Sequence, residues 1–301
     1  MKVLVIGMGS IGQRHCEVLQ GLEQVERVDS VSRKASTGAT YGSLDAVVSP
    51  EIYDYFVIAN ETYRHYETLE WITTRMDGKT ILVEKPLYEK PYTLDLKSNR
   101  VYVAYNLRFH PLMGHIRKEI AGEALLYANA IVGQYLPTWR PGRDYRESYS
   151  ASSKKGGGVL RDLSHELDYL CWLAGPLASI EAIDTKVSSL EIDAEDLFTA
   201  IGRTEQGSVI NVSMDYISKI PLRQLILHTN GKTLIADLIR HVLHIVEVDG
   251  TERTLHSECE RNETYKRMHH SLIVSDGKSL CTYAQGLGLV HLIESVLREG
   301  R

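Results

Sequence analysis

The first residues of the chain that could do chemistry are the glycines of Gly7-Met8-Gly9-Ser10-Ile11-Gly12. The motif follows a short apolar run, residues 2–6, that predicts a buried parallel strand, and it precedes a predicted helix. In that setting the glycines allow a tight turn, a close approach of the backbone to a pyrophosphate, and close packing of helix on strand. Free N–H groups at the helix start would bind the phosphates. We therefore predict a nucleotide cofactor held by Gly7, Gly9, Ser10, Ile11 and Gly12.

The second predicted strand, residues 25–33, ends where a dinucleotide-binding fold meets the adenosine ribose. An acid that would bind the ribose 2′-hydroxyl is missing there, and Ser32, Arg33 and Lys34 take its place. Asp29 is the nearest acid, but it lies earlier, inside the strand. Arg33 and Lys34 are either a solvated turn or a cradle for a 2′-phosphate, and the cradle favours NADP over NAD. We predict cofactor contacts from Ser32 and Arg33.

Polar residues also follow two later strands, predicted at 53–59 and 80–83. In open α/β sheets, ligands bind at the C-terminal ends of the strands. A proline at position 86 fixes the backbone just after Lys85 and keeps Lys85 extended. The residues that we expect near the cofactor are Asn60, Glu61, His65, Glu84 and Lys85.

A predicted helical segment that begins with three glycines, residues 156–158, carries further candidates. Hydride transfer between a nicotinamide and an alcohol needs a base for the hydroxyl proton. Asp162, His165 or Glu166, and Tyr169 have the spacing to share one face of a helix. His165 is either this base or a helix residue paired with Asp162 for stability. The preceding glycines and the charged strand end favour the base.

Cationic and aromatic side chains gather just before that segment, within residues 135–146. Guanidinium groups bind carboxylates and phosphates, and aromatic rings stack on sugars or bases. The stretch is therefore either an ordinary structured loop or a lid over an anionic substrate. The predicted substrate contacts, one of them from an earlier segment, are Arg108, Trp139, Arg143 and Tyr145.

Strands and helices alternate as far as residue 108, which predicts a doubly wound parallel sheet. From about residue 124 the strands lengthen, lose their intervening helices and are joined by glycine turns. The predicted fold class is α/β, with an N-terminal Rossmann domain at 1–108 and an α+β domain at 109–301 that contains a large, mostly antiparallel open sheet. Its uncovered face would expose apolar positions, for example within 209–214, and so favours a homodimer or homotetramer.

The composition argues against several other classes of protein. A net charge of −5 without a basic cluster does not suit nucleic-acid binding. No apolar run is long enough for a membrane span, and a strand at the very start leaves no room for a signal peptide. Four dispersed cysteines predict a cytoplasmic protein without disulfides. Because no histidine pair has the spacing of a metal site, we expect no metal.

Five segments together make the chain resemble the Gfo/Idh/MocA family, the relatives of glucose–fructose oxidoreductase and inositol dehydrogenase. They are GMGSIGQRH at 7–15, IANETYRH at 58–65, VEKP at 83–86, YNLRFHP at 105–111 and GGGVLRDLSHELD at 156–168. The resemblance covers essentially the whole length. It implies a Rossmann domain before an α/β domain whose open sheet often mediates oligomerisation. It also implies NAD- or NADP-dependent hydride transfer at a hydroxyl or keto carbon of a sugar, cyclitol or sugar nucleotide.

Residue by residue, the resemblance implies that Lys85 touches both nicotinamide and substrate, and that Asp162 and His165 are the catalytic aspartate and histidine. The family's histidine commonly comes four residues after the aspartate, whereas His165 comes three after it. Glu166 occupies the usual place, so the base is either His165 or Glu166. Two other functions remain open: a non-catalytic NAD(P)-binding sensor, and reduction of a cyclic imine or a biliverdin-like ligand on the same fold. Retention of Lys85, Asp162 and a nearby histidine argues against the sensor.

Overall fold

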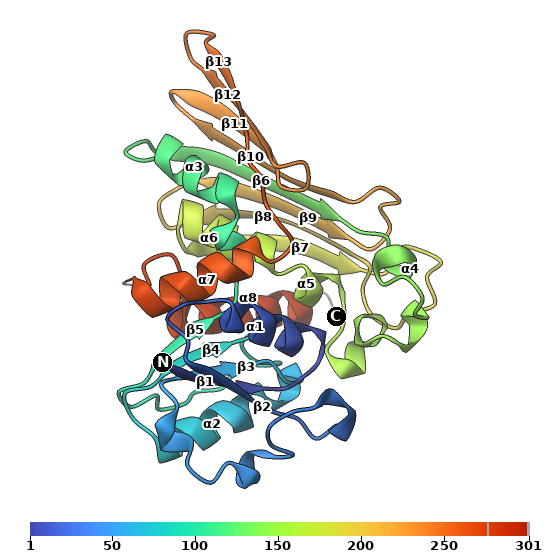
Figure 1. Cartoon of the computed structure of the whole chain (residues 1–301). Coiled ribbons are helices and arrows are strands. Elements are labelled where there is room, and N and C mark those ends of the chain that lie inside the picture. Colours follow the sequence, from blue (N-terminus) through green and yellow to red (C-terminus); the bar gives the residue numbers. More distant parts are fainter. Residues whose placement is uncertain (276, 300–301) are drawn as a thin grey trace. The chain divides into compact units, whose positions relative to one another are not determined.

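The computed structural model describes residues 1–275 and 277–299, and it separates into two compact units (Figure 1). The first unit comprises Met1–Phe109 and Glu260–His291, and the second comprises His110–Cys259 and Leu292–Arg301. The sequence predicted a single boundary between residues 108 and 109. In the structure the chain leaves the first unit after Phe109 but returns to it at Glu260.

The first unit contains a six-stranded sheet in the order β14-β5-β4-β3-β1-β2. β1 to β5 are parallel, and only β14 runs antiparallel to its neighbour. The chain moves outward from β1 in both directions, which is the topology of a Rossmann-like sheet and confirms the predicted one. The strands are β1 (Lys2–Ile6), β2 (Arg27–Val31), β3 (Tyr55–Ile58), β4 (Thr80–Val83), β5 (Arg100–Val103) and β14 (Cys281–Thr282).

Helices cover both faces of this parallel sheet, as buried β-branched strands require. Figure 1 shows α1 and α7 on one side of the strands and α2 on the other. The core between α1, α7 and the sheet includes Val5, Leu19 and Met268. The helices are α1 (Ser10–Gln20), α2 (His65–Arg75), α7 (Glu263–Val274) and the first part of α8 (Tyr283–Glu299), with the 3-10 turns η1 (Ala35–Thr37), η2 (Leu44–Ala46), η3 (Pro50–Ile52), η4 (Thr62–Arg64) and η5 (Asn106–Phe109).

The second unit contains an eight-stranded sheet in the order β13-β12-β11-β10-β6-β9-β8-β7. Its neighbours are antiparallel except β6 and β9, so the predicted mostly antiparallel sheet is confirmed. The strands are β6 (Leu125–Gly133), β7 (Leu177–Thr185), β8 (Leu197–Thr204), β9 (Val209–Asp215), β10 (Leu222–Thr229), β11 (Lys232–Asp237), β12 (Val242–Glu247) and β13 (Glu252–His256).

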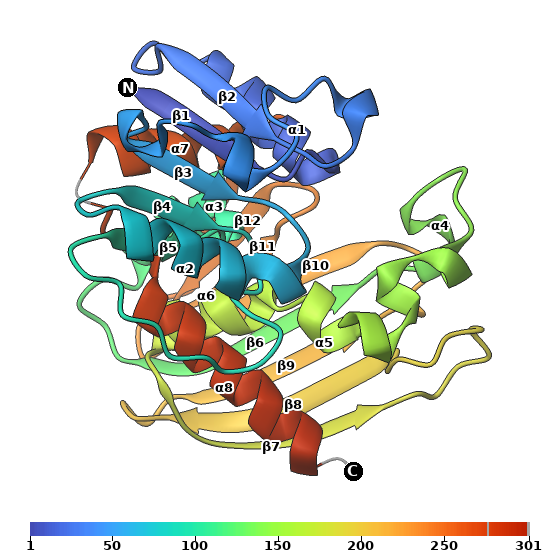
Figure 2. The same ribbon diagram turned by 90° about the horizontal axis from the view of Figure 1, so that it is seen from below.

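The helices of the second unit pack on one face of its sheet. Figure 2 shows α5 and α6 in front of the strands β6, β9 and β8, which they contact. The unit's helices are α3 (Pro111–Glu119), α4 (Leu136–Trp139), α5 (Val159–Asp162), α6 (His165–Ala174) and the end of α8, with the 3-10 turns η6 (Tyr145–Glu147), η7 (Tyr149–Ala151) and η8 (Ser153–Lys155). Within the described ranges, no helix combines the length and apolar character needed to cross a bilayer.

Side chains alternate between the two faces of this sheet, as the strand period requires. On β9, Ile210 and Met214 are at most 1% exposed. The expectation that 209–214 supplies exposed apolar positions is therefore wrong, because its large side chains point into the core. On the opposite face, Ile183, Ile201 and Ile235 are 60%, 54% and 41% exposed.

We predict that the chain forms a homodimer or homotetramer through the sheet face that carries these three isoleucines, because their burial would remove apolar surface from water. Light scattering at micromolar concentration should return a multiple of the 33.9 kDa chain mass. Ile201→Glu should shift the mass toward the monomer, since a charge would enter the contact. Val48→Glu, at a 90% exposed residue of the first unit, is the matched control and should change nothing. A monomeric parent protein would contradict the prediction.

Candidate active site

The glycine loop after β1 leaves no room for side chains at two positions. A Cβ on Gly7, which has φ of +102°, would lie 2.4 Å from the backbone nitrogen of Asn60. A Cβ on Gly12 would lie 1.8 Å from the Gly7 carbonyl oxygen, so only glycine lets α1 approach β1 this closely. Around Gly9 no atom lies within 4 Å of a would-be Cβ. This open space at the start of α1, where Ser10 and Ile11 present helix N–H groups, fits a phosphate.

The end of β2 brings together the residues that were predicted to meet the ribose. An Arg33 Nη2 atom lies 3.5 Å from Glu61 Oε1, and both side chains are more than half exposed. Ser32 Oγ accepts a hydrogen bond from the backbone N–H of Lys34. Asp29 is buried, and it accepts hydrogen bonds from Tyr53 Oη at 2.5 Å and Arg27 Nε at 2.7 Å. It is committed to the protein interior, so the accessible charges here are those of Lys34, of Arg33 and of its partner Glu61.

The segment after β4 is held in place by His65. This ring is 1% exposed, and its Nδ1 lies 3.1 Å from the carbonyl oxygens of Pro86 and Leu87. Its Nε2 lies 3.2 Å from the Asn60 carbonyl oxygen. Burial lowers the pKa of His65, and the neighbouring carbonyls only partly oppose this shift. Although predicted to contact the cofactor, His65 faces backbone carbonyl oxygens with both ring nitrogens, and the nitrogen that carries the proton donates to the backbone.

The helical segment around Asp162 is broken in two. α5 ends at Asp162 and α6 begins at His165, with a turn at Leu163 and Ser164 between them. The expectation of one helix face shared by Asp162, His165 and later residues is therefore wrong. Asp162 is 6% exposed and accepts a hydrogen bond of 2.6 Å from the hydroxyl of Tyr216, which follows β9.

Glu166 points into the packing between α6 and the sheet. It is fully buried, with Arg223 Nε of β10 at 2.8 Å from Oε1 and the Tyr169 hydroxyl donating to the same oxygen at 3.2 Å. Burial raises the pKa of Glu166, and the Arg223 charge and the Tyr169 hydrogen bond oppose the rise. His165 keeps partial exposure, whereas Glu166 is enclosed. Of the two residues that the sequence left open, this environment favours His165 as the base.

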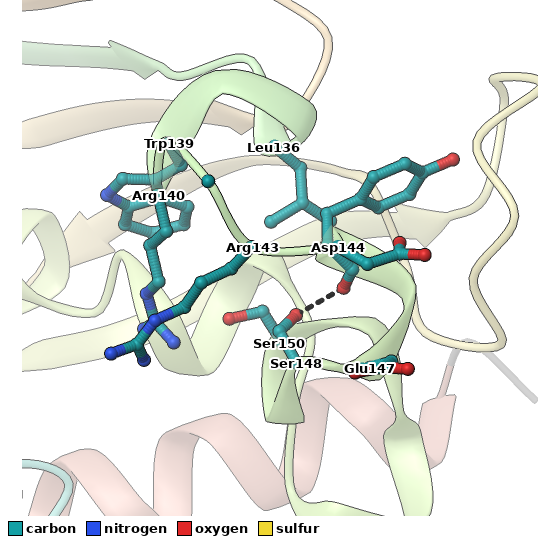
Figure 3. Close-up of a pocket in the computed structure, with 10 residues that line it drawn as sticks. Leu136, Trp139, Arg140, Arg143, Asp144, Glu147, Ser148 and Ser150 are labelled. Atoms are coloured by element: carbon teal, nitrogen blue, oxygen red, sulfur yellow. Dashed lines mark hydrogen bonds between the residues drawn. The ribbon is translucent and has the colours of Figure 1, made fainter.

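A pocket of about 380 Å³ forms in the basic and aromatic loop before α5 (Figure 3). Its lining includes three of the four predicted substrate residues, Trp139, Arg143 and Tyr145. In Figure 3 the Arg140 and Arg143 side chains extend to the same side of the loop. The loop is fixed internally, because the hydroxyl of Ser148 donates to the Tyr145 carbonyl oxygen at 2.6 Å.

Arg108, the fourth predicted substrate residue, has a different environment in the first unit. It is 4% exposed, and its Nη1 donates to the Leu280 carbonyl oxygen and to Gln285 Oε1, both at 3.1 Å. These bonds tie η5 to the segment that leads into α8. Arg108 is not among the residues that line the pocket.

Glu195 supports the start of α5, and sequence reasoning missed it. Its backbone carbonyl oxygen accepts from Val159 N–H at 3.2 Å, and its Oε1 accepts from Leu160 N–H at 3.4 Å. A Cβ on Gly158 would lie 1.9 Å from Oε1, so this glycine makes room for the carboxyl. Burial, followed by the charge of Asp184, raises the pKa of Glu195 to about 7. No local motif marks the residue, because its partners lie 35 positions earlier.

One group of side chains has the composition of a metal site: His110, His241 and Cys259, with ligand atoms within 4.8 Å of one another. His110 Nε2 and His241 Nδ1 are 2.9 Å apart. His110 Nδ1 accepts a hydrogen bond from the backbone N–H of Leu112 at 3.2 Å. A neutral His110 ring must then carry its proton on Nε2, which faces His241 as a donor and not as a metal ligand. The absence of a metal stays a prediction.

Residues 120–234 match the family model of the GFO/IDH/MocA C-terminal domain. The match runs from the end of α3 into β11 and includes the Asp162 segment. This segment of the chain belongs to the GFO/IDH/MocA C-terminal domain family.

The relatives of this chain are distant in sequence. An uncharacterized oxidoreductase from Synechocystis sp. is 26% identical over 201 residues, which are 60% of this chain and 53% of that protein. UDP-N-acetylglucosamine 3-dehydrogenase from Acidithiobacillus ferrooxidans is 24% identical over 258 residues, 81% of this chain and 76% of the relative. The solved structure of levoglucosan dehydrogenase in complex with NADH and levoglucosan matches with a TM-score of 0.84 at 15% identity. The match covers 100% of this chain and 96% of the levoglucosan dehydrogenase chain. The chain thus spans about half of the first relative, and the structural likeness shows a shared fold.

Glu195→Gln should remove a pH-dependent loss of stability from the Gfo/Idh/MocA C-terminal domain. Because the folded-state pKa of Glu195 is about 7, above its usual value, stability is full below the unfolded-state pKa and falls as pH rises through 7. The glutamine, which mimics the protonated form, should be close to the parent near pH 5 and more stable at pH 8. The advantage should grow by at most about 1.4 kcal/mol per pH unit in between. Urea unfolding measures it.

Glu205→Gln, at an exposed glutamate, is the matched control and should show no such trend. An advantage of Glu195→Gln that is the same at pH 5 and pH 8 would contradict the assignment.

Proposed function

We propose that the chain is an NAD(P)-dependent oxidoreductase that transfers hydride to or from a hydroxyl or keto carbon of a sugar, cyclitol or sugar nucleotide. The observation that carries the proposal is the first unit's strand-end geometry. The glycine loop leaves an open space for a phosphate, and Glu84 and Lys85 follow β4 of the same sheet. The match of residues 120–234 to the family model and the names of the relatives support the same chemistry.

In this proposal the chain's own residues bind the reacting oxygen and move its proton. A bound nicotinamide supplies or accepts the hydride. Lys85 binds the substrate oxygen, and its positive charge stabilises a developing alkoxide. His165 takes the hydroxyl proton in the oxidation direction or returns it in the reduction direction. Asp162, itself oriented by the Tyr216 hydroxyl at 2.6 Å, orients this pair and favours the charged lysine.

The pocket in the loop before α5 supports the proposed substrate class. Trp139 and Tyr145 offer rings for stacking, and Arg140 and Arg143 offer guanidinium groups for a carboxylate or phosphate. This combination fits a sugar that carries an acidic group, such as a nucleotide sugar. UDP-N-acetylglucosamine, named for the Acidithiobacillus relative, is therefore the first substrate to test.

His165→Ala and Lys85→Ala should each lower kcat by about 10²–10⁴, since a base or an electrophile is lost, while cofactor affinity changes little. The measurement is single-turnover NAD(P)H absorbance with acidic and neutral sugars, beside cofactor titration. Glu166→Gln is the comparison variant, with thermal unfolding to confirm its fold. A crippled Glu166→Gln beside a mild His165→Ala would move the base to Glu166. Full rates in both alanine variants would contradict the roles of His165 and Lys85, whereas a parent protein that binds NAD(P)H but turns over none of the sugars would favour the sensor.

NADP(H) should bind more tightly than NAD(H), because Arg33 is an accessible cation beside Lys34 at the end of β2 and can pair with a 2′-phosphate. Arg33→Asp should reverse the preference, since the acid repels the phosphate and accepts from a ribose hydroxyl. Titration by cofactor fluorescence measures both constants. Arg75→Asp, at the exposed end of α2, controls for the change in net charge. An unchanged NADP/NAD ratio in Arg33→Asp would overturn the preference.

A further inference from the structure

Four side chains form a continuous hydrogen-bonded chain through the core of the first unit. The Tyr55 hydroxyl oxygen lies 2.7 Å from His269 Nδ1, and His269 Nε2 lies 2.8 Å from His15 Nδ1. His15 Nε2 lies 3.0 Å from Glu84 Oε1. The residues come from β3, α7, α1 and the end of β4. Tyr55, His15 and His269 are fully buried, and the Glu84 side chain is 12% exposed.

The hydrogen bond at the Tyr55 end of this hydrogen-bond chain fixes which atom donates and which accepts at each contact. Within residues 1–275 and 277–299, His269 is the sole hydrogen-bond partner of the Tyr55 hydroxyl. A buried O–H needs an acceptor, so it donates to His269 Nδ1. Burial raises the pKa of Tyr55 well above its usual value, and burial, followed by the charge of His15, lowers the pKa of His269. A neutral His269 that accepts at Nδ1 carries its proton on Nε2 and donates to His15.

The hydrogen bonds of the Glu84 carboxylate require the same direction of donation, from Tyr55 toward Glu84. Glu84 Oε2 already accepts from the backbone N–H of Lys85 at 3.1 Å. An ionised carboxylate can only accept, so His15 Nε2 must be the donor to Oε1. His15 Nδ1 is then the acceptor that His269 requires. A doubly protonated His15 would set two N–H groups against each other at the contact between the rings.

We propose that His15 and His269 are positioning residues, which with Tyr55 form a one-way hydrogen-bond chain that holds Glu84 as a fixed carboxylate beside Lys85. The inference rests on the proposed function, because Lys85 there binds the substrate oxygen. The hydrogen-bond chain links Glu84 to His15 on α1, the helix that starts at the glycine loop, and from there to His269 on α7. Each member strengthens the polarity of the next, since hydrogen bonds in series polarise one another. The Glu84 charge in turn favours the ammonium form of its neighbour Lys85.

The direction of the chain can be measured without any substrate. Long-range proton–nitrogen NMR of histidine-labelled protein at pH 7, with signals assigned from His15 and His269 variants, reports which ring nitrogen carries the proton. Both rings should be neutral with the proton on Nε2. In His269→Phe, His15 should keep its proton on Nε2, because the Glu84 carboxylate still accepts from it. A parent spectrum with either ring doubly protonated, or with its proton on Nδ1, would overturn the inference.

The positioning role is measured by kinetics. Glu84→Gln and His269→Phe should lower kcat by about 10- to 100-fold through misplacement of Lys85, with the NADH dissociation constant nearly unchanged. Tyr55→Phe, which leaves the carboxylate end intact, should lose less. His270→Phe, at the exposed neighbour on α7, is the matched control and should keep full activity. Thermal unfolding identifies any variant that fails to fold.

Three outcomes separate the inference from the function on which it rests. Parent-like kcat in folded Glu84→Gln and His269→Phe overturns the positioning role. If the parent enzyme is active but its two histidines show other tautomers, the proposed direction of the hydrogen-bond chain is wrong and the proposed function stands. If the parent protein shows the expected tautomers but neither binds NADH nor turns over a sugar, the proposed function is wrong. The positioning role then falls with it, whereas the direction of the hydrogen-bond chain stands.

Discussion

The contact between Gly12 and the carbonyl oxygen of Gly7 is the constraint on which the first unit depends. A methyl group at position 12 would lie 1.8 Å from that oxygen, so only glycine lets α1 lie so close to the end of β1. This approach decides where the second turn of α1 falls. His15 on that turn reaches both His269 and Glu84. The same glycines that expose N–H groups for a phosphate therefore also place the protein's own buried hydrogen bonds.

In the second unit, an ion pair decides which side chain of the helical segment stays accessible. Arg223 of β10 holds the fully buried Glu166 at 2.8 Å. Consecutive residues on a helix differ by about 100° in direction, so this contact turns His165 away from the sheet. A buried pair of this kind contributes little net stability, but the loss of one partner leaves an uncompensated charge. Its structural effect here is to fix the rotation of α6.

Much of the fold could be predicted from sequence, because apolar runs and glycine turns are local signals. The apolar run 2–6 followed by the glycines of 7–12 indicates the Rossmann start, and the later long strands joined by glycine turns indicate the antiparallel sheet. Features that depend on tertiary contacts could not be predicted from the sequence. The break at Leu163 and Ser164, the inward direction of Ile210 and Met214, and the role of Glu195 depend on partners far along the chain. Arg108 likewise looked like a ligand residue, yet it bonds to the segment around Leu280.

The first unit is built from two separate stretches of chain, and this ordering has a consequence for biosynthesis. Residues 260–291, which include α7 and β14, are made after residues 110–259, the main part of the second unit. Until they leave the ribosome, β5 lacks its outer neighbour, and Tyr55 and His15 lack the ring that joins them. The nascent N-terminal part therefore waits with an unpaired strand edge and an open core, a form prone to aggregation. This N-terminal part is completed only after more than half of the remaining chain has been made, so chaperone protection matters most for the segment that is synthesised first.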